Sequence, residues 1–256
     1  MNSFKISSAN VPSDFYLEVA KGSFPGYVDY SAFGVNFDID TTSTPEDIWL
    51  NGGVFVPPTT YRIHNISSSS VNDTVAGTGA RTLLIQGVIS TGLSSEIINM
   101  NGISTVATVN SYSDIYAMEV LTAGSGTMNA GNISAVAQTD GTTTAFIAIN
   151  GLNSAKKAIR LIPPGYIGYL YNFQGGMQQA TATSFADVSL QTKTSTGVWI
   201  SRRFHGLSNT GSSVEDDVFK SPLVLSTGTW VKIQCTNVTN NNTIVQGEFN
   251  LLLIKN

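Results

Sequence analysis

Short runs of alternating apolar and polar residues, each closed by a turn signal, recur along this chain of 256 residues. Successive side chains of a strand point to opposite faces, so a period of two indicates strands with one buried face. No long segment has the 3.6-residue period of an amphipathic helix, and we expect little helix. The predicted strands are Thr82–Val88, Glu96–Met100, Val106–Asn110, Ile115–Leu121, Ile133–Ala137, Thr144–Ile149, Ala158–Ile162, Tyr166–Asn172, Phe185–Thr192, Val198–Phe204, Leu223–Ser226, Thr229–Cys235 and Glu248–Ile254. Their spacing predicts an all-β fold of antiparallel β-sandwich or jelly-roll regions.

Turn residues between these runs also predict which strands pair. Asn101-Gly102 stands between two alternating runs and is a hairpin signal. For the last run, Glu248–Ile254, we expect a docked apolar face, because an exposed one would be an aggregation-prone edge. Its predicted partner is Trp230–Cys235, across the Asn-rich link Asn237–Thr243.

The domain organisation is predicted from changes in periodicity. Residues 1–45 carry aromatic, Pro and Gly residues with poor alternation, and we interpret them as an extended N-terminal arm or anchor. Residues 46–150 form one predicted β-sandwich region, and residues 151–256 form a second, jelly-roll-like one. The stretch Asn150–Ser154 is the expected joint between them.

The composition excludes several classes of function. Only 12% of the residues are charged, the formal net charge is −4, and Lys and Arg never form more than a pair. A nucleic-acid groove needs a basic stripe, so we expect no nucleic-acid partner. No apolar run approaches the ~20 residues of a membrane helix, and we expect no membrane insertion. The single cysteine excludes an intrachain disulfide, and Met1–Ile6 lacks the apolar core of a secretory signal, so we expect synthesis and folding in a cytosol.

We find no residue set that predicts catalysis, a cofactor or a metal ion. His64 and His205 lie in strand-like runs without a nucleophile motif, and a structural role is favoured for both. Acidic residues gather at Asp38-Ile39-Asp40, Glu46-Asp47 and Glu215-Asp216-Asp217. Such groups suit a glycosidase or a weak Ca²⁺ site, although solvated loop acids are the favoured interpretation. We therefore predict that the protein is not an enzyme.

Aromatic residues are the remaining candidates for binding. Tyr166, Tyr169 and Tyr171 follow the Pro163-Pro164-Gly165 turn, and Trp199 lies in a predicted strand. Exposed aromatic faces beside amide or carboxylate groups bind sugars, whereas buried ones serve cores and subunit interfaces. The core or interface interpretation is favoured, and the ligand platform is the alternative.

Several segments together resemble a family of virion structural proteins found mainly in tailed phages. These segments are Phe33–Asp40, Pro45–Gly53, Ala76–Gly87, Glu96–Gly102, Ile162–Leu170 and Glu248–Ile254. The resemblance implies a capsid-decoration, spike or fibre protein without catalytic residues, located in the virion. The expected partners are further copies of the chain, as a trimer, and other virion proteins. The alternative is a carbohydrate- or receptor-binding β-sandwich module that recognises a host surface glycan.

Overall fold

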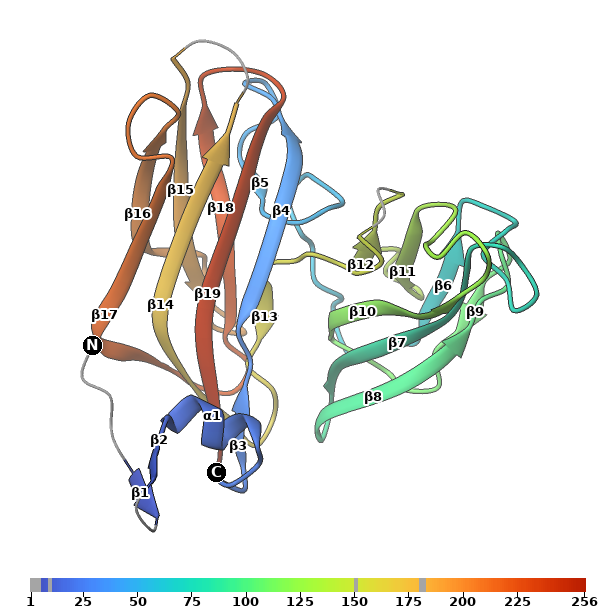
Figure 1. The fold of residues 1–256 in the computed structure, drawn as a ribbon, viewed down its shortest axis with the longest axis horizontal. Coiled ribbons are helices and arrows are strands. Elements are labelled where there is room, and N and C mark those ends of the chain that lie inside the picture. The colour runs from blue at the N-terminus through green and yellow to red at the C-terminus, as the bar shows by residue number, and fades with distance from the viewer. Residues whose placement is uncertain (1–5, 9–10, 150–151, 180–182) are drawn as a thin grey trace.

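The computed structural model describes residues 6–8, 11–149, 152–179 and 183–256, and these residues form an all-β fold of antiparallel strands (Figure 1). Its elements are β1 (Ile6–Ser8), β2 (Val11–Ser13), α1 (Phe15–Ala20), β3 (Tyr27–Asp29), β4 (Ala32–Ile39), β5 (Glu46–Asp47), β6 (His64–Ser68), β7 (Ala80–Ile89), β8 (Gly92–Asn99), β9 (Val106–Ala107), β10 (Asp114–Ala123), β11 (Ile133–Ala137), β12 (Thr143–Ile147), β13 (Ile159–Leu161), β14 (Tyr166–Gln178), β15 (Phe185–Lys193), β16 (Ile200–Ser208), β17 (Val214–Leu225), β18 (Trp230–Val238) and β19 (Thr243–Lys255). The predictions of an all-β fold, antiparallel strands and little helix are confirmed.

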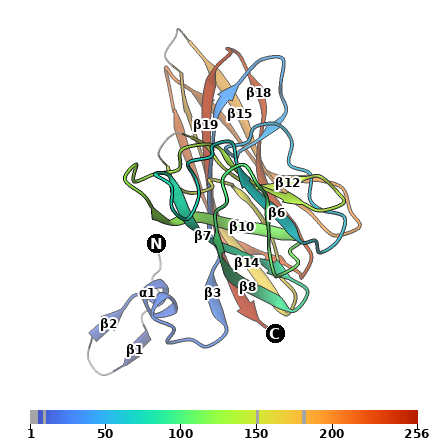
Figure 2. The same ribbon diagram turned by 90° about the vertical axis from the view of Figure 1, so that its right-hand side faces the viewer.

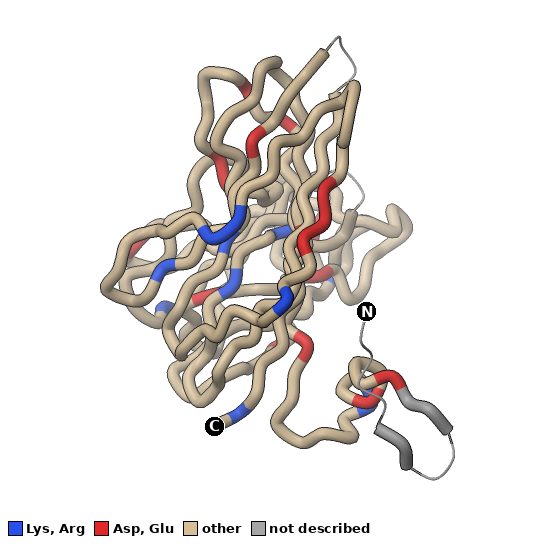
Figure 3. The backbone as a smooth tube through the Cα atoms, turned by 90° about the vertical axis from the view of Figure 1, so that its left-hand side faces the viewer, with Lys and Arg blue, Asp and Glu red and all other residues tan. Residues whose placement is uncertain are grey.

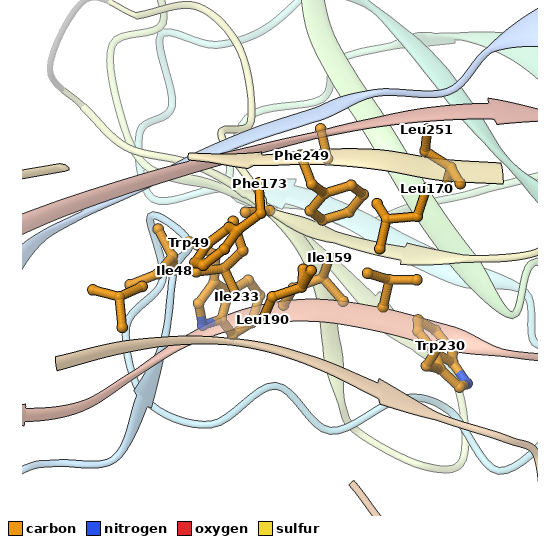
Figure 4. Close-up of a cluster of buried hydrophobic side chains, with 14 of the residues drawn as sticks. Ile48, Trp49, Ile159, Leu170, Phe173, Leu190, Trp230, Ile233, Phe249 and Leu251 are labelled. Carbon is orange, nitrogen blue, oxygen red and sulfur yellow. The ribbon is translucent and has the colours of Figure 1, made fainter. Parts of the chain in front are cut away.

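Two five-stranded sheets enclose the larger core. The β14 sheet has the order β17-β14-β19-β3, with β4 also paired to β19. The β18 sheet has the order β13-β18-β15-β16, with β5 also paired to β18. Between them, Leu170, Phe173 and Phe249 of the β14 sheet pack towards Leu190 and Ile233 of the β18 sheet (Figure 4). Burying each of these side chains contributes roughly 1.5–3 kcal/mol to folding.

Strand β18 shows how alternation positions polar residues. Ile233 and Cys235 belong to the core between the two sheets. Lys232 and Gln234 alternate with them, and both bind the buried carboxylate of Asp47 on the next strand, β5, at 2.7 and 2.9 Å. The side of β18 that points away from this core is therefore also covered, because Lys232 is buried with its counterion Asp47.

Two smaller sheets enclose a second core. The four-stranded sheet has the order β12-β11-β6-β9, and the three-stranded sheet has the order β10-β7-β8. Ile66, Leu83, Ile115, Met118 and Ile133 are fully buried, or nearly so, in this core. Figure 1 shows this unit beside the larger pair of sheets.

The strand pairing corrects the predicted domain boundaries. Residues 27–39, predicted within the arm, form β3 and β4, which pair with β19. Strand β5, predicted to open the first β-sandwich region, instead pairs with β18 of the predicted second region. The smaller unit is thus an insertion between β5 and β13, and residues from both ends of the chain share the larger core. Of the predicted joint Asn150–Ser154, Asn150 and Gly151 lie outside the described residues, and Ser154 forms a bridge with Glu119 of β10.

Two predicted strand pairings are wrong. The chain does turn at Asn101-Gly102, but β8 pairs with β7 and β9 pairs with β6, so the turn carries the chain between sheets. Likewise, β19 pairs with β14 and β4, whereas β18 belongs to the opposite sheet. In both cases the connecting residues permit a tight turn but do not determine whether it stays within one sheet.

A buried ion pair joins the insertion to the larger unit. The ammonium nitrogen of Lys157 donates to Asp114 Oδ1 at 2.6 Å and to the carbonyl oxygens of Ile115 and Thr144 at 2.8 Å each. Lys157 also lies over the ring of Phe55, 4.7 Å from its centroid. Lys157 is 3% exposed and Asp114 fully buried, so neither charge has solvent as an alternative partner.

Next to this pair, aromatic rings and an arginine complete the junction. Tyr30 of the larger unit and Tyr116 of the insertion meet edge to face, with ring centroids 4.9 Å apart. The guanidinium of Arg160 lies 5.5 Å from both ring centroids. Contacts of this kind between two units fix their relative orientation.

Candidate functional site: an uncovered sheet face and its N-terminal segment

Tyr169 and Tyr171, two of the four predicted aromatic residues, lie half-buried on β14. Tyr169 stands opposite Val224 of β17 and Leu252 of β19. Tyr171 stacks on Tyr16 of α1, with ring centroids 5.3 Å apart, and burial raises the pKa of its hydroxyl. Because the neighbouring Leu170 belongs to the core, alternation directs Tyr169 to the outer surface of the β14 sheet.

The other two predicted aromatic residues lie elsewhere. Tyr166 packs on the larger core, close to the β7–β8 turn, where a Cβ at Gly92 would lie 3.7 Å from its ring. Trp199 is half-buried with its ring over Lys232 and Lys193, whose ammonium nitrogens lie 4.5 and 5.9 Å from the centroid. The structure therefore does not bring the four predicted residues into one site.

The outer surface of the β14 sheet carries uncovered apolar side chains, and we call it the outer face. Val218 and Val224 of β17 are 56% and 65% exposed, and Phe33 of β4 is also exposed. Their cross-strand neighbours include Asn172 and Glu248, so apolar and polar groups are mixed. Figure 3 shows charged residues thinly scattered over the backbone, with an acidic stretch where β17 carries three consecutive acids. Such a mixed, weakly charged surface has the composition of a protein interface.

The N-terminal segment, residues 6–26 as far as the structure describes them, projects from the β14 sheet. It consists of the β1–β2 hairpin and α1, and Figures 1 and 2 show it extending beyond the body of the molecule. Asp14 caps α1 by accepting a hydrogen bond from the backbone of Tyr16 at 2.9 Å. Beside the stacked Tyr16, Leu17 is half exposed. A small aromatic cluster thus attaches α1 to the sheet while part of its apolar surface stays open.

Among the acidic groups of the sequence, Glu46 and Asp47 are engaged in structural contacts. Glu46 accepts hydrogen bonds from Asn36 Nδ2 at 2.8 Å and from the backbone of Gly53 at 2.7 Å. Burial raises the pKa of Asp47, although its contact with Lys232 opposes that shift. Within the described residues, no cluster of three or more His, Cys, Asp or Glu side chains suits a metal ion.

The two histidines are likewise packed into the fold. His64 is fully buried, its Nδ1 donates to the carbonyl oxygen of Arg62 at 2.9 Å, and its pKa is lowered by burial to about 4. His205 stacks on Phe173 of the opposite sheet, with ring centroids 4.2 Å apart. Burial also lowers the pKa of His205, against the nearby acids of β17. Neither histidine lies beside a serine or cysteine in hydrogen-bonding contact among the described residues.

Comparison with known proteins adds no relative. The chain matches no protein-family model, and a search of curated proteins finds no similar sequence. In the described part of the chain, no helix has the length and apolar character needed to cross a membrane.

Proposed function

We propose that this protein is a structural component of a virion, acting as a capsid-decoration, spike or fibre subunit. The observation that carries the proposal is the outer face, where Val218 and Val224 of β17 remain uncovered on either side of a register shift between β17 and β14. A chain with only 12% charged residues can bury such a face against another copy without desolvating many ions. The assembly we propose is a closed homotrimer, located on the particle with other virion proteins.

We further propose that the larger pair of sheets is a jelly roll. Its strands alternate between the sheets along the chain, since β4, β14, β17 and β19 belong to one and β5, β13, β15, β16 and β18 to the other. Connections that pass repeatedly between two facing sheets are typical of jelly rolls, an architecture found in viral capsid domains and in lectins. This strand order supports both a virion subunit and a glycan-binding module, so the fold alone does not choose between them.

The N-terminal segment suits the role of an anchor to neighbouring subunits. Because β3 and β4 belong to the larger core, only residues 1–26 remain available as an anchor, rather than the predicted residues 1–45. The segment contacts the sheet through a small aromatic cluster, in which Tyr16 stacks on Tyr171 and Phe15 and Phe24 lie against Tyr27 of β3, and Leu17 is open to a partner. An extended segment of this kind orders further when it binds.

The test of this assembly is the solution mass of the full chain by light scattering over a range of concentrations. We expect three times the mass of the single chain. Replacing Val218 and Val224 together by lysine should dissociate the trimer, because two ammonium groups would be desolvated at the contact. The matched control is Phe204→Lys, since Phe204 is 58% exposed on β16 of the other sheet. A wild-type chain that stays monomeric, or a control that dissociates equally, contradicts assembly through the outer face.

Carbohydrate recognition is the second candidate function. It is favoured by Tyr169, whose half-buried ring lies on the outer face near Asn172 and Asn250, and by the proposed jelly roll. We propose no catalytic activity, because the acids and histidines of the described residues serve ion pairs, backbone hydrogen bonds and packing.

A further inference from the structure

A small cavity lies where two connections of the larger unit meet. It has a volume of about 140 Å³ and is lined by residues of the β15–β16 connection, including Thr194 and Val198, and of the β17–β18 connection, including Ser226 and Thr229. Ligand sites for drug-sized molecules occupy roughly 300 to 1,000 Å³. The cavity therefore suits one small ring or the terminal residue of a larger ligand.

Hydroxyl groups and one guanidinium make up its polar lining. Thr192 is 2% exposed, and its Oγ1 accepts a hydrogen bond from Arg202 Nε at 2.8 Å. This contact fixes the guanidinium at the cavity, while its two Nη atoms make no hydrogen bond to the described residues. The hydroxyls of Ser226 and Thr229 lie 3.4 Å apart on the other connection. An arginine held through Nε presents a forked pair of donors that matches a carboxylate.

The remaining lining determines which anion fits. No carboxylate side chain lines the cavity, although acidic residues outnumber basic ones in the chain by 17 to 13. Val198, which is 75% exposed, supplies an aliphatic surface at the same site. A sugar presents hydroxyls at its rim and C–H groups on its faces, and so uses both parts of this lining. A bare inorganic anion would leave the aliphatic surface and most of the hydroxyls unused.

We propose that this cavity binds a carboxylated sugar residue of a glycan, with Arg202 binding the carboxylate and Thr194, Ser226 and Thr229 binding ring hydroxyls. The proposal rests on the second candidate function, glycan recognition, for which it names the site and the substrate class. It places recognition at the connections between strands rather than at the predicted aromatic residues. Trp199 stands between two lining residues in sequence but does not itself line the cavity.

The experiment is titration of the full chain with D-glucuronate, with N-acetylneuraminate and with D-glucose as the neutral sugar, by calorimetry. We expect at least one acidic sugar to bind about tenfold or more tightly than glucose, since the charge-assisted pair is absent from the neutral ligand. Arg202→Met should weaken acidic-sugar binding by about tenfold or more, and Arg202→Lys by less, because lysine keeps the charge but not the fork. Arg203→Met is the matched control, because Arg203 pairs with Asp217 at 2.9 Å and does not line the cavity.

Three results would overturn the proposal: no binding of either acidic sugar, equal binding of glucose, or equal loss in Arg202→Met and Arg203→Met. Circular dichroism of each variant establishes that the fold is retained, and Ser226→Ala offers a second, milder change of the same lining. If acidic sugars fail here but bind elsewhere on the chain, glycan recognition stands and only this site is refuted. Glycan recognition itself is tested by binding of the wild-type chain to a broad set of immobilised glycans.

Discussion

Replacing Lys157 by methionine tests whether the buried ion pair holds the insertion to the larger unit. The change keeps most of the side-chain volume and removes three hydrogen bonds. Asp114 is then a fully buried carboxylate whose one remaining donor is the backbone of Leu161, at 3.2 Å. Removing one partner of such a pair lowers the free energy of unfolding by about 3–5 kcal/mol. Because Asp114 keeps only one weak donor, we expect this variant to lose about 5 kcal/mol.

The second buried pair provides an internal comparison. In Lys232→Met, Asp47 keeps two good donors, Gln234 Nε2 at 2.9 Å and the backbone of Phe55 at 2.8 Å. We therefore expect the free energy of unfolding to fall by about 3 kcal/mol, the lower limit for removing one partner of a buried pair. Adding Asp114→Asn to Lys157→Met removes the unpaired charge and should recover part of the loss. Lys21→Met is the exposed control, because its pair with Glu18 is open to solvent and should change the free energy of unfolding little.

The assay is urea unfolding followed in parallel by two probes. All three tryptophans belong to the larger unit, so fluorescence reports on it alone, whereas far-ultraviolet circular dichroism reports on both units. In the wild type we expect coincident transitions, and in Lys157→Met a dichroism transition that begins at lower urea than the fluorescence transition. A loss below about 1 kcal/mol, or a double variant no more stable than Lys157→Met, would refute the assignment of the ion pair as the connection.

Two further variants test packing and protonation. His64 has a folded pKa lowered to about 4, whereas the usual pKa of a histidine is about 6.5, so the unfolded chain binds this proton first as the pH falls. The contribution of the neutral His64 to the free energy of unfolding is complete above pH 6.5, and about 2–3 kcal/mol of stability is lost by pH 4.5. His64→Gln should remove this loss when urea titrations above pH 6.5 and at pH 4.5 are compared. A pH dependence unchanged in that variant would contradict this source. Gly34→Ala should lower the free energy of unfolding by about 3 kcal/mol or more in thermal unfolding, because the added Cβ would overlap the backbone of Ile48 and Ala158. The control is Gly206→Ala on β16, which should be neutral because the nearest atom to the added Cβ lies at 3.8 Å. Equal effects of the two changes would show that the close approach at Gly34 is relaxed.

The sequence predicts most strands but not how they assemble. The run around Tyr166 alternates because one face of β14 packs into the core, whereas the run around Trp230 alternates in residue type although β18 is buried on both faces. Strand β4 was predicted as part of an arm because its buried positions are not all apolar in sequence. Gly34 faces a crowded backbone, and Asn36 is buried against Glu46. Tertiary contacts thus replace the local pattern on that strand.

The candidate sites were less predictable than the strands. An outward-facing Tyr169 follows from alternation alone, but the pairing that places it beside Val224 joins residues far apart in the chain. The cavity at Arg202 combines two connections that are separated along the chain by two strands, β16 and β17, and no local motif relates them. Buried lysines such as Lys157 were invisible as well, because their partners lie in another unit.

The insertion departs from and returns to almost the same point of the larger unit. Strands β5 and β13 both pair with β18, and just beyond them Trp49 faces Lys157 across an antiparallel bridge. Residues paired in this way have Cα atoms about 5 Å apart, so a tight turn could close the same gap. The insertion is in this respect a cassette: a short turn between β5 and β13 could replace it without altering the strand order of the larger unit, and the side chains that would lose partners include Lys157, Arg160 and Val88.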